Sequence, residues 1–119
     1  MIGKIIAGSS FGATVSYVMK EQSRILGFEG IEPPGVQDMV RDFKDQTLLN
    51  PRIKNAVGHI SLPFSPKDAD RLTDPAMAQI AREYMERMGI RNTLFLIVRH
   101  MDQAHPHCHI VYNRVGNDG

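Results

Sequence analysis

Two apolar runs near the end of the chain, separated by a short polar stretch, constrain the fold most strongly. NTLFLIV covers residues 92–98, and HCHIVYNRV begins at residue 107. Both runs predict strands, and MDQAHP between them has the length of a hairpin loop. Alternation along the second run places His107 and His109 on one face. If the loop joins directly paired positions, His100 lies opposite His107, and three imidazoles share one face of an antiparallel hairpin.

The remaining patterns predict three more strands and three helices. The strands are expected over residues 1–8, 24–30 and 56–64. The helices are expected over residues 9–22, 36–49 and 74–88, where apolar residues recur at helical spacing. Asp74 is expected to cap the last helix, and Met88 belongs to its apolar stripe. We therefore predict an α+β fold: a mainly antiparallel sheet with helices packed on it and the histidine motif on the last hairpin.

Length and composition indicate one domain over residues 1–119. No apolar run is long enough to cross a membrane and no signal-peptide pattern is present, so we predict a cytoplasmic protein. The single cysteine, Cys108, excludes an intrachain disulfide and is expected in the core. The net charge of +1 does not by itself indicate a nucleic-acid partner. The final RVGNDG is a turn signal with no strand after it, which predicts that the chain is the N-terminal part of a longer protein.

The histidines predict a divalent metal site. Three neutral imidazoles from His100, His107 and His109 would leave coordination positions open for a substrate, as catalytic sites do. Asp102 is placed to accept the second N–H of a ligand histidine. His105 falls in the loop, outside this register, and His59 lies on an earlier strand. Both are candidates for contacts around the ligands, and His59 could also hold a phosphate or a tyrosine.

The sequence around these histidines resembles a motif of a known protein family. HMDQAHPHCHIVYNRV looks like the third motif of relaxases, the histidine–hydrophobe–histidine endonucleases that mobilise plasmids and transposons. The matching positions are His100, Asp102, His107, His109, Asn113 and Arg114. GSSFGATVSYVMKE resembles the motif with the nucleophilic tyrosine, which assigns that role to Tyr17. HISLPFSPKDADRLTD and IAREYMERMGI resemble the middle motif and the helix after it, so the resemblance covers essentially the whole chain.

The resemblance implies an enzyme that nicks single-stranded DNA at an origin of transfer in the bacterial cytoplasm. The tyrosine attacks the scissile phosphorus and forms a 5′-phosphotyrosyl link, which conserves the bond for rejoining. A free tyrosine is a weak nucleophile at neutral pH because its pKa is about 10, so a divalent metal or a base must assist. Mg²⁺ or Mn²⁺ is expected in the cell, and Zn²⁺ or Ni²⁺ would also fit. Accessory mobilisation proteins are candidate partners, and Asp102 is expected to take part in catalysis.

Single-stranded DNA needs positive charge only along its path. The candidate contacts are Lys4, Lys20, Arg24, Arg99 and Arg114, with Asn113 added because it shares the histidine face. By the same alternation Arg114 faces the other way and could form a salt bridge instead.

Two alternatives remain open at this point. HPHCHIV also fits the pattern of histidine-triad nucleotide hydrolases, which need no metal, although Pro106 suits a central strand poorly and His100, Asp102 and Tyr17 would have no role. The chain could also be a non-catalytic, metal-stabilised DNA-binding module with Tyr17 in a structural role.

Overall fold

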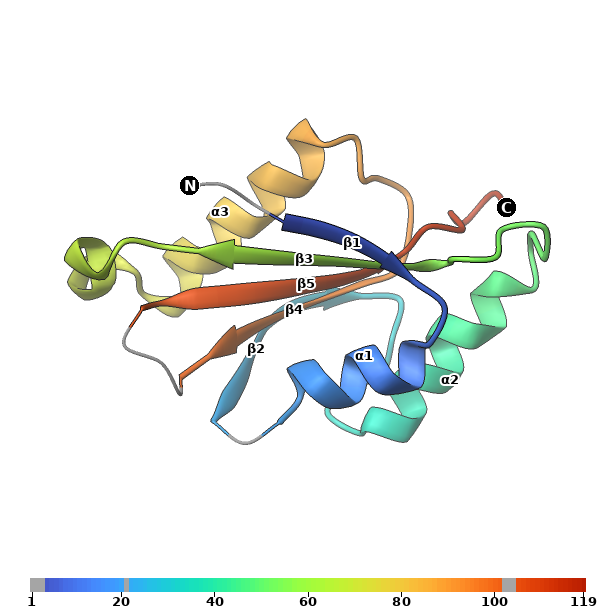
Figure 1. The fold of residues 1–119 in the computed structure, drawn as a ribbon, viewed down its shortest axis with the longest axis horizontal. Coiled ribbons are helices and arrows are strands. Elements are labelled where there is room, and N and C mark those ends of the chain that lie inside the picture. The colour runs from blue at the N-terminus through green and yellow to red at the C-terminus, as the bar shows by residue number, and fades with distance from the viewer. Residues whose placement is uncertain (1–3, 21, 102–104) are drawn as a thin grey trace.

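The computed structural model describes residues 4–20, 22–101 and 105–119, and its centre is a five-stranded antiparallel sheet (Figure 1). The strands lie in the order β1-β3-β5-β4-β2, so the last strand of the chain is in the middle of the sheet. The prediction of an α+β fold with the histidine motif on the last hairpin is confirmed. The strands are β1 (Lys4–Gly8), β2 (Ser23–Glu29), β3 (Val57–Pro63), β4 (Phe95–His100) and β5 (His107–Asn113).

Helices cover both faces of this sheet. The helices α1 (Phe11–Val18) and α2 (Val36–Thr47) pack on one face, and α3 (Asp74–Arg87) packs on the other (Figure 1). A short 3₁₀ helix, Pro66–Arg71, joins β3 to α3. Within the described part of the chain, no helix is both long and apolar enough to span a bilayer.

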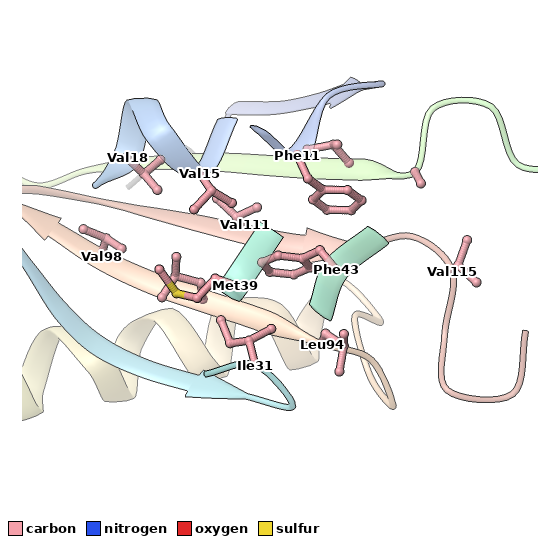
Figure 2. Packing of buried hydrophobic residues seen from close by; sticks show 13 residues of the cluster. Phe11, Val15, Val18, Ile31, Met39, Phe43, Leu94, Val98, Val111 and Val115 are labelled. Atoms are coloured by element: carbon pink, nitrogen blue, oxygen red, sulfur yellow. The ribbon is translucent and has the colours of Figure 1, made fainter. Parts of the chain in front are cut away.

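The face under α1 and α2 is apolar along most of its length. Phe11 of α1 and Phe43 of α2 stack with ring centroids 4.7 Å apart, and both rings are buried (Figure 2). Val15 and Val18 continue the buried stripe of α1 towards its C-terminal end. Because these three α1 residues face the sheet, Tyr17 is turned away from the apolar core.

The opposite face is filled by the methionine stripe of α3. Met77 and Met85 are buried there together with Cys108 of β5, as predicted for that cysteine. Burial raises the pKa of the Cys108 thiol to about 12, an effect that nearby Arg99 partly offsets. Met88 was predicted in the core, but it lies just after α3 and is 49% exposed, so this prediction is wrong.

The start of α3 also differs from the prediction. Thr73, not Asp74, caps the helix, because its side-chain oxygen accepts a hydrogen bond from the Ala76 N–H at 3.2 Å. Asp74 is the first helical residue, and its carboxylate binds two arginines instead: Arg24 of β2 at 3.0 Å and Arg99 of β4 at 3.2 Å.

One close contact on the α3 face yields a test of the fold. Gly58 of β3 pairs with Tyr112 of β5, and a Cβ atom at Gly58 would lie 2.2–2.6 Å from three atoms of the Tyr112 ring. We expect Gly58→Ala to lower the free energy of unfolding by about 1–3 kcal/mol, the usual cost of overpacking. Denaturant unfolding measures this change.

Gly12→Ala is the matched control, because the nearest atom to its added Cβ is 3.8 Å away and the position is helical. The free energy of unfolding of this control variant should equal that of the wild type or be slightly higher. If the Gly58 effect comes from the ring, it should shrink in a Tyr112→Ala background. An equal loss in both backgrounds would mean that the ring is not the cause.

Candidate metal centre

The last hairpin brings three histidines together on the face that α1 and α2 cover. His100 pairs directly with His107, as the loop length predicted, and His109 is the diagonal neighbour. Their ring centroids are 4.2 to 5.3 Å apart, and all three side chains are buried. One ring nitrogen from each lies within 4.8 Å of the other two. The predicted convergence of the three imidazoles is therefore present.

Two of these rings are oriented by main-chain carbonyls. Nε2 of His100 lies 2.9 Å from the Val18 carbonyl oxygen, and Nδ1 of His107 lies 3.2 Å from the His105 carbonyl oxygen. A carbonyl can only accept, so the ring nitrogen in each pair must carry the proton and donate. Nδ1 of His100 and Nε2 of His107 are then left as lone-pair atoms that can bind a cation.

The third ring is held by a fourth histidine. Nδ1 of His109 lies 2.8 Å from Nε2 of His59, and Nε2 of His109 is buried with no hydrogen-bond partner among the described residues. Burial, followed by the charges of His100, His59, His107 and Lys20, lowers the pKa of His109 to about 3. The pKa of His59 is also lowered, by burial and then by His100. Both rings are therefore neutral at neutral pH. When His109 is the donor in this pair, its buried Nε2 keeps its lone pair and can act as a ligand atom.

Taken together, these donors fit a divalent cation. Each of the three imidazoles can present one lone pair to a cation while its other nitrogen is in a hydrogen bond, and for His100 and His107 the carbonyl partner fixes the tautomer. An all-nitrogen set suits Zn²⁺, Ni²⁺, Cu²⁺ and Fe²⁺ best, whereas Mg²⁺ prefers oxygen ligands. His105 is not one of the three, in agreement with its predicted place in the loop.

Tyr17 lies at the edge of this cluster. Its ring centroid is 5.6 Å from that of His109, 6.0 Å from His100 and 6.1 Å from His59. The side chain is 50% exposed, so the tyrosine contacts the histidines while remaining open to solvent. The predicted proximity of Tyr17 to the three-histidine face is therefore present. Lys20 lies nearby, with its ammonium 5.1 Å from the Tyr17 ring centroid.

A pocket of about 280 Å³ opens beside the cluster. Its floor is formed by two rungs of the β3–β5 ladder, where Ser61 pairs with His109 and Pro63 pairs with His107. Tyr17 and His105 complete the lining. One water molecule takes about 30 Å³ in the liquid, so this pocket has room for a much larger group.

Several predicted DNA contacts lie elsewhere. Arg24 and Arg99 face α3, where both bind Asp74, and Arg99 also donates to the Leu72 carbonyl oxygen. They are on the opposite side of the sheet from the histidines because their side chains alternate with those of Ser23 and His100. In the structure both arginines fix the start of α3, and their predicted contact with DNA stays a prediction.

Asn113 and Arg114 lie at the other end of β5, about 13 Å or more along the strand from His109. Asn113 is 1% exposed, and its amide bonds the Phe43 carbonyl oxygen and the Val115 N–H, so it braces α2 instead of facing DNA. Arg114 donates to the Asn55 carbonyl oxygen at 2.7 Å. The expected contact of either residue with DNA at the histidine site is not supported by these positions.

Two predicted groups cannot be placed. Asp102 lies outside the described residues, and so does the side chain of Lys4. Sequence reasoning also missed the carbonyl groups of Val18 and His105, which orient two of the histidines. A main-chain carbonyl has no residue signature, so only the folded backbone reveals such a contact.

A comparison with models of known protein families found a match. Residues 17–119 match the family model described as Relaxase: MobA/VirD2-like, nuclease domain. Comparisons with curated proteins and with solved structures found no significant match. The matched range begins at Tyr17 and includes all four histidines of the cluster.

The contact between His59 and His109 predicts an effect on metal affinity. We expect His59→Ala to weaken the binding of Ni²⁺ or Mn²⁺ by about 10–100-fold, because the hydrogen bond that orients His109 is lost. Isothermal titration calorimetry measures the dissociation constant. His105→Ala is the matched control, since that exposed side chain can be removed while its carbonyl keeps its bond to His107. Equal losses in the two variants would contradict the role of His59.

The lowered pKa of His109 predicts how stability depends on pH in the metal-free protein. The pKa of a histidine in the unfolded chain is about 6.5, and that of folded His109 is about 3. Between these values the unfolded chain binds a proton that the folded protein does not. The free energy of unfolding should therefore fall as pH falls below about 6.5, by at most about 1.4 kcal/mol per pH unit from this residue. Urea unfolding across this range should give a shallower slope for His109→Gln, and an unchanged slope would refute the assignment.

Proposed function

Because this chain belongs to the relaxases of the MobA/VirD2-like nuclease family, we propose that it nicks single-stranded DNA at an origin of transfer through a covalent link to Tyr17. Membership in this family supports a DNA-nicking relaxase in general. The finer proposal is that the nick starts the mobilisation of a plasmid or transposon in the bacterial cytoplasm, with accessory mobilisation proteins as partners.

The observation that carries the proposal is the position of Tyr17. A half-exposed tyrosine stands with its ring 5.6–6.1 Å from three histidine rings, two of which are in the candidate metal triad. A tyrosine that only filled the core would be buried and would need no such neighbours. Here the ring is at the edge of a polar pocket, where its oxygen can approach a bound phosphodiester.

The proposed step is a transesterification. The Tyr17 oxygen bonds to the scissile phosphorus as the bond between phosphorus and the 3′-oxygen breaks. The tyrosine proton passes to solvent, and the departing 3′-oxygen takes up a proton to become a hydroxyl. A divalent ion held by His100, His107 and His109 would polarise the phosphate oxygens and neutralise the charge that develops on them. Breaking one ester bond while making another keeps the bond available for rejoining.

Other residues have narrower proposed roles. The Lys20 ammonium adds positive charge close to Tyr17, so we retain it as a contact to the DNA backbone. His59 holds His109 and lies beside Tyr17, which supports a role in placing both. Asp102 remains a proposed partner of a ligand histidine. Mg²⁺ or Mn²⁺ remains the proposed cellular ion, although the nitrogen donors favour later transition metals.

The histidine-triad hydrolase is a weaker candidate. Its pattern would use His105, His107 and His109 together, but β5 begins at His107 and the His105 side chain is exposed in the loop. The relaxase proposal also accounts for His100 and Tyr17. The remaining alternative, a non-catalytic DNA-binding module, predicts that no covalent adduct forms.

The decisive experiment looks for that adduct. Incubation with Mn²⁺ and single-stranded DNA from the transfer origin of the source element should yield a protein–DNA conjugate, seen as a shifted band on a denaturing gel. We expect Tyr17→Phe to abolish it, because the attacking oxygen is removed. Mass spectrometry of the digested conjugate should locate the DNA on the Tyr17 peptide.

Tyr84→Phe is the control, because Tyr84 packs on the α3 face, away from the histidines. This variant should form the conjugate at the wild-type rate. A conjugate that forms normally in Tyr17→Phe would remove the nucleophile assignment. If the wild-type protein forms none, the covalent mechanism fails.

A further inference from the structure

The candidate metal centre is not symmetric, and its asymmetry indicates from which side a substrate reaches it. The triad sits on β4 and β5, with β2 flanking it on one side and β3 on the other. A serine occupies the equivalent place on each flank: Ser23 of β2 pairs with His100, and Ser61 of β3 pairs with His109. Both serines are half-buried, and neither hydroxyl makes a hydrogen bond within the part of the chain that the structure describes.

On the β3 flank the described residues form a pocket. The cavity of about 280 Å³ is lined by Ser61 but not by Ser23. Among its described lining residues, only Ser61 and Tyr17 carry side-chain hydroxyl groups, and three histidines supply imidazoles: His105, His107 and His109. The Ser61 hydroxyl therefore lines the same pocket as two candidate metal ligands, His107 and His109, and the proposed nucleophile Tyr17.

We propose that Ser61 is a substrate-binding residue that donates a hydrogen bond to a non-bridging oxygen of the scissile phosphodiester, which enters the site from the β3 flank. This inference rests on the proposed function for the identity of the diester. A phosphodiester carries one negative charge on two oxygens. One oxygen can face the triad while the other takes the Ser61 proton. None of the described residues that line the pocket carries a carboxylate.

The chemistry of the pocket favours this ligand over a neutral one. Hydrogen bonds to a charged group are roughly twice as strong as those between neutral groups, so a single hydroxyl contributes most when its acceptor is anionic. Ser61 also sits opposite His109, the ligand whose buried Nε2 has no partner among the described residues. A diester beside a cation held by this Nε2 would therefore be within reach of the Ser61 hydroxyl.

The test measures diester binding separately from nicking. The probe is the dinucleotide TpT, which carries one phosphodiester and no nick sequence. Its ³¹P signal broadens when it binds beside Mn²⁺ held by the protein, and titration gives a dissociation constant. We expect Ser61→Ala to weaken TpT binding about 10-fold, while the Mn²⁺ affinity, measured by calorimetry, stays unchanged. Ser61→Thr keeps the hydroxyl and should restore most of the affinity.

Ser23→Ala is the matched control on the other flank and should bind TpT as the wild type does. Equal affinities for Ser61→Ala and Ser23→Ala would overturn the proposal, as would the absence of any broadening with the wild-type protein. If TpT binding depends on Ser61 but no DNA conjugate forms in the nicking assay, the diester site stands and the proposed relaxase mechanism fails. If the DNA conjugate forms at the same rate with and without the Ser61 hydroxyl, the proposed role of Ser61 is refuted and the relaxase mechanism is left intact.

Discussion

The hydrogen bond between Nε2 of His100 and the Val18 carbonyl oxygen ties the two halves of the site together. Val18 is the last residue of α1, and the final carbonyls of a helix have no partner within it. By donating to this carbonyl, His100 completes the helix end and fixes its own tautomer. Tyr17 is the preceding residue, so the same 2.9 Å contact sets the height of the tyrosine above the histidines. A change at either end of this bond would alter both the candidate ligand His100 and the proposed nucleophile Tyr17.

The surrounding architecture explains why such a polar cluster can be buried. Each histidine of the triad uses one nitrogen in a hydrogen bond to a neighbour: the Val18 carbonyl, the His105 carbonyl or the His59 ring. Three strands, one helix end and one loop therefore converge on the site. The cost of burying imidazoles falls when their donors are satisfied. The buried Nε2 of His109, which makes no hydrogen bond to any described residue, is the clearest candidate to bind a cation.

The sequence was informative where local periodicity decides the outcome, and less so where distant groups compete for a side chain. The loop length and the alternation of β5 predicted that His100, His107 and His109 converge, and the hairpin register confirms it. Alternation also put Asn113 on the same face, but it could not reveal that the Phe43 carbonyl lies above that end of the strand. Arg24 was predicted to contact DNA from its charge alone. Its ion pair with Asp74, fifty residues later, depends on how α3 packs, which no local pattern encodes.

The whole chain has a net charge of only +1, so any strong attraction for DNA would have to come from charge concentrated at the candidate site. Burial and neighbouring groups lower the pKa of His109 and keep this candidate ligand unprotonated at neutral pH. A carboxylate ligand would cancel part of the charge of a divalent ion, whereas imidazoles leave all of it for the substrate. The pocket beside the ion contains no carboxylate among the described residues, and Lys20 lies close to Tyr17. If a divalent ion occupies the triad, attraction for a phosphate would be concentrated at the proposed site, and a basic surface over the whole domain would not be required.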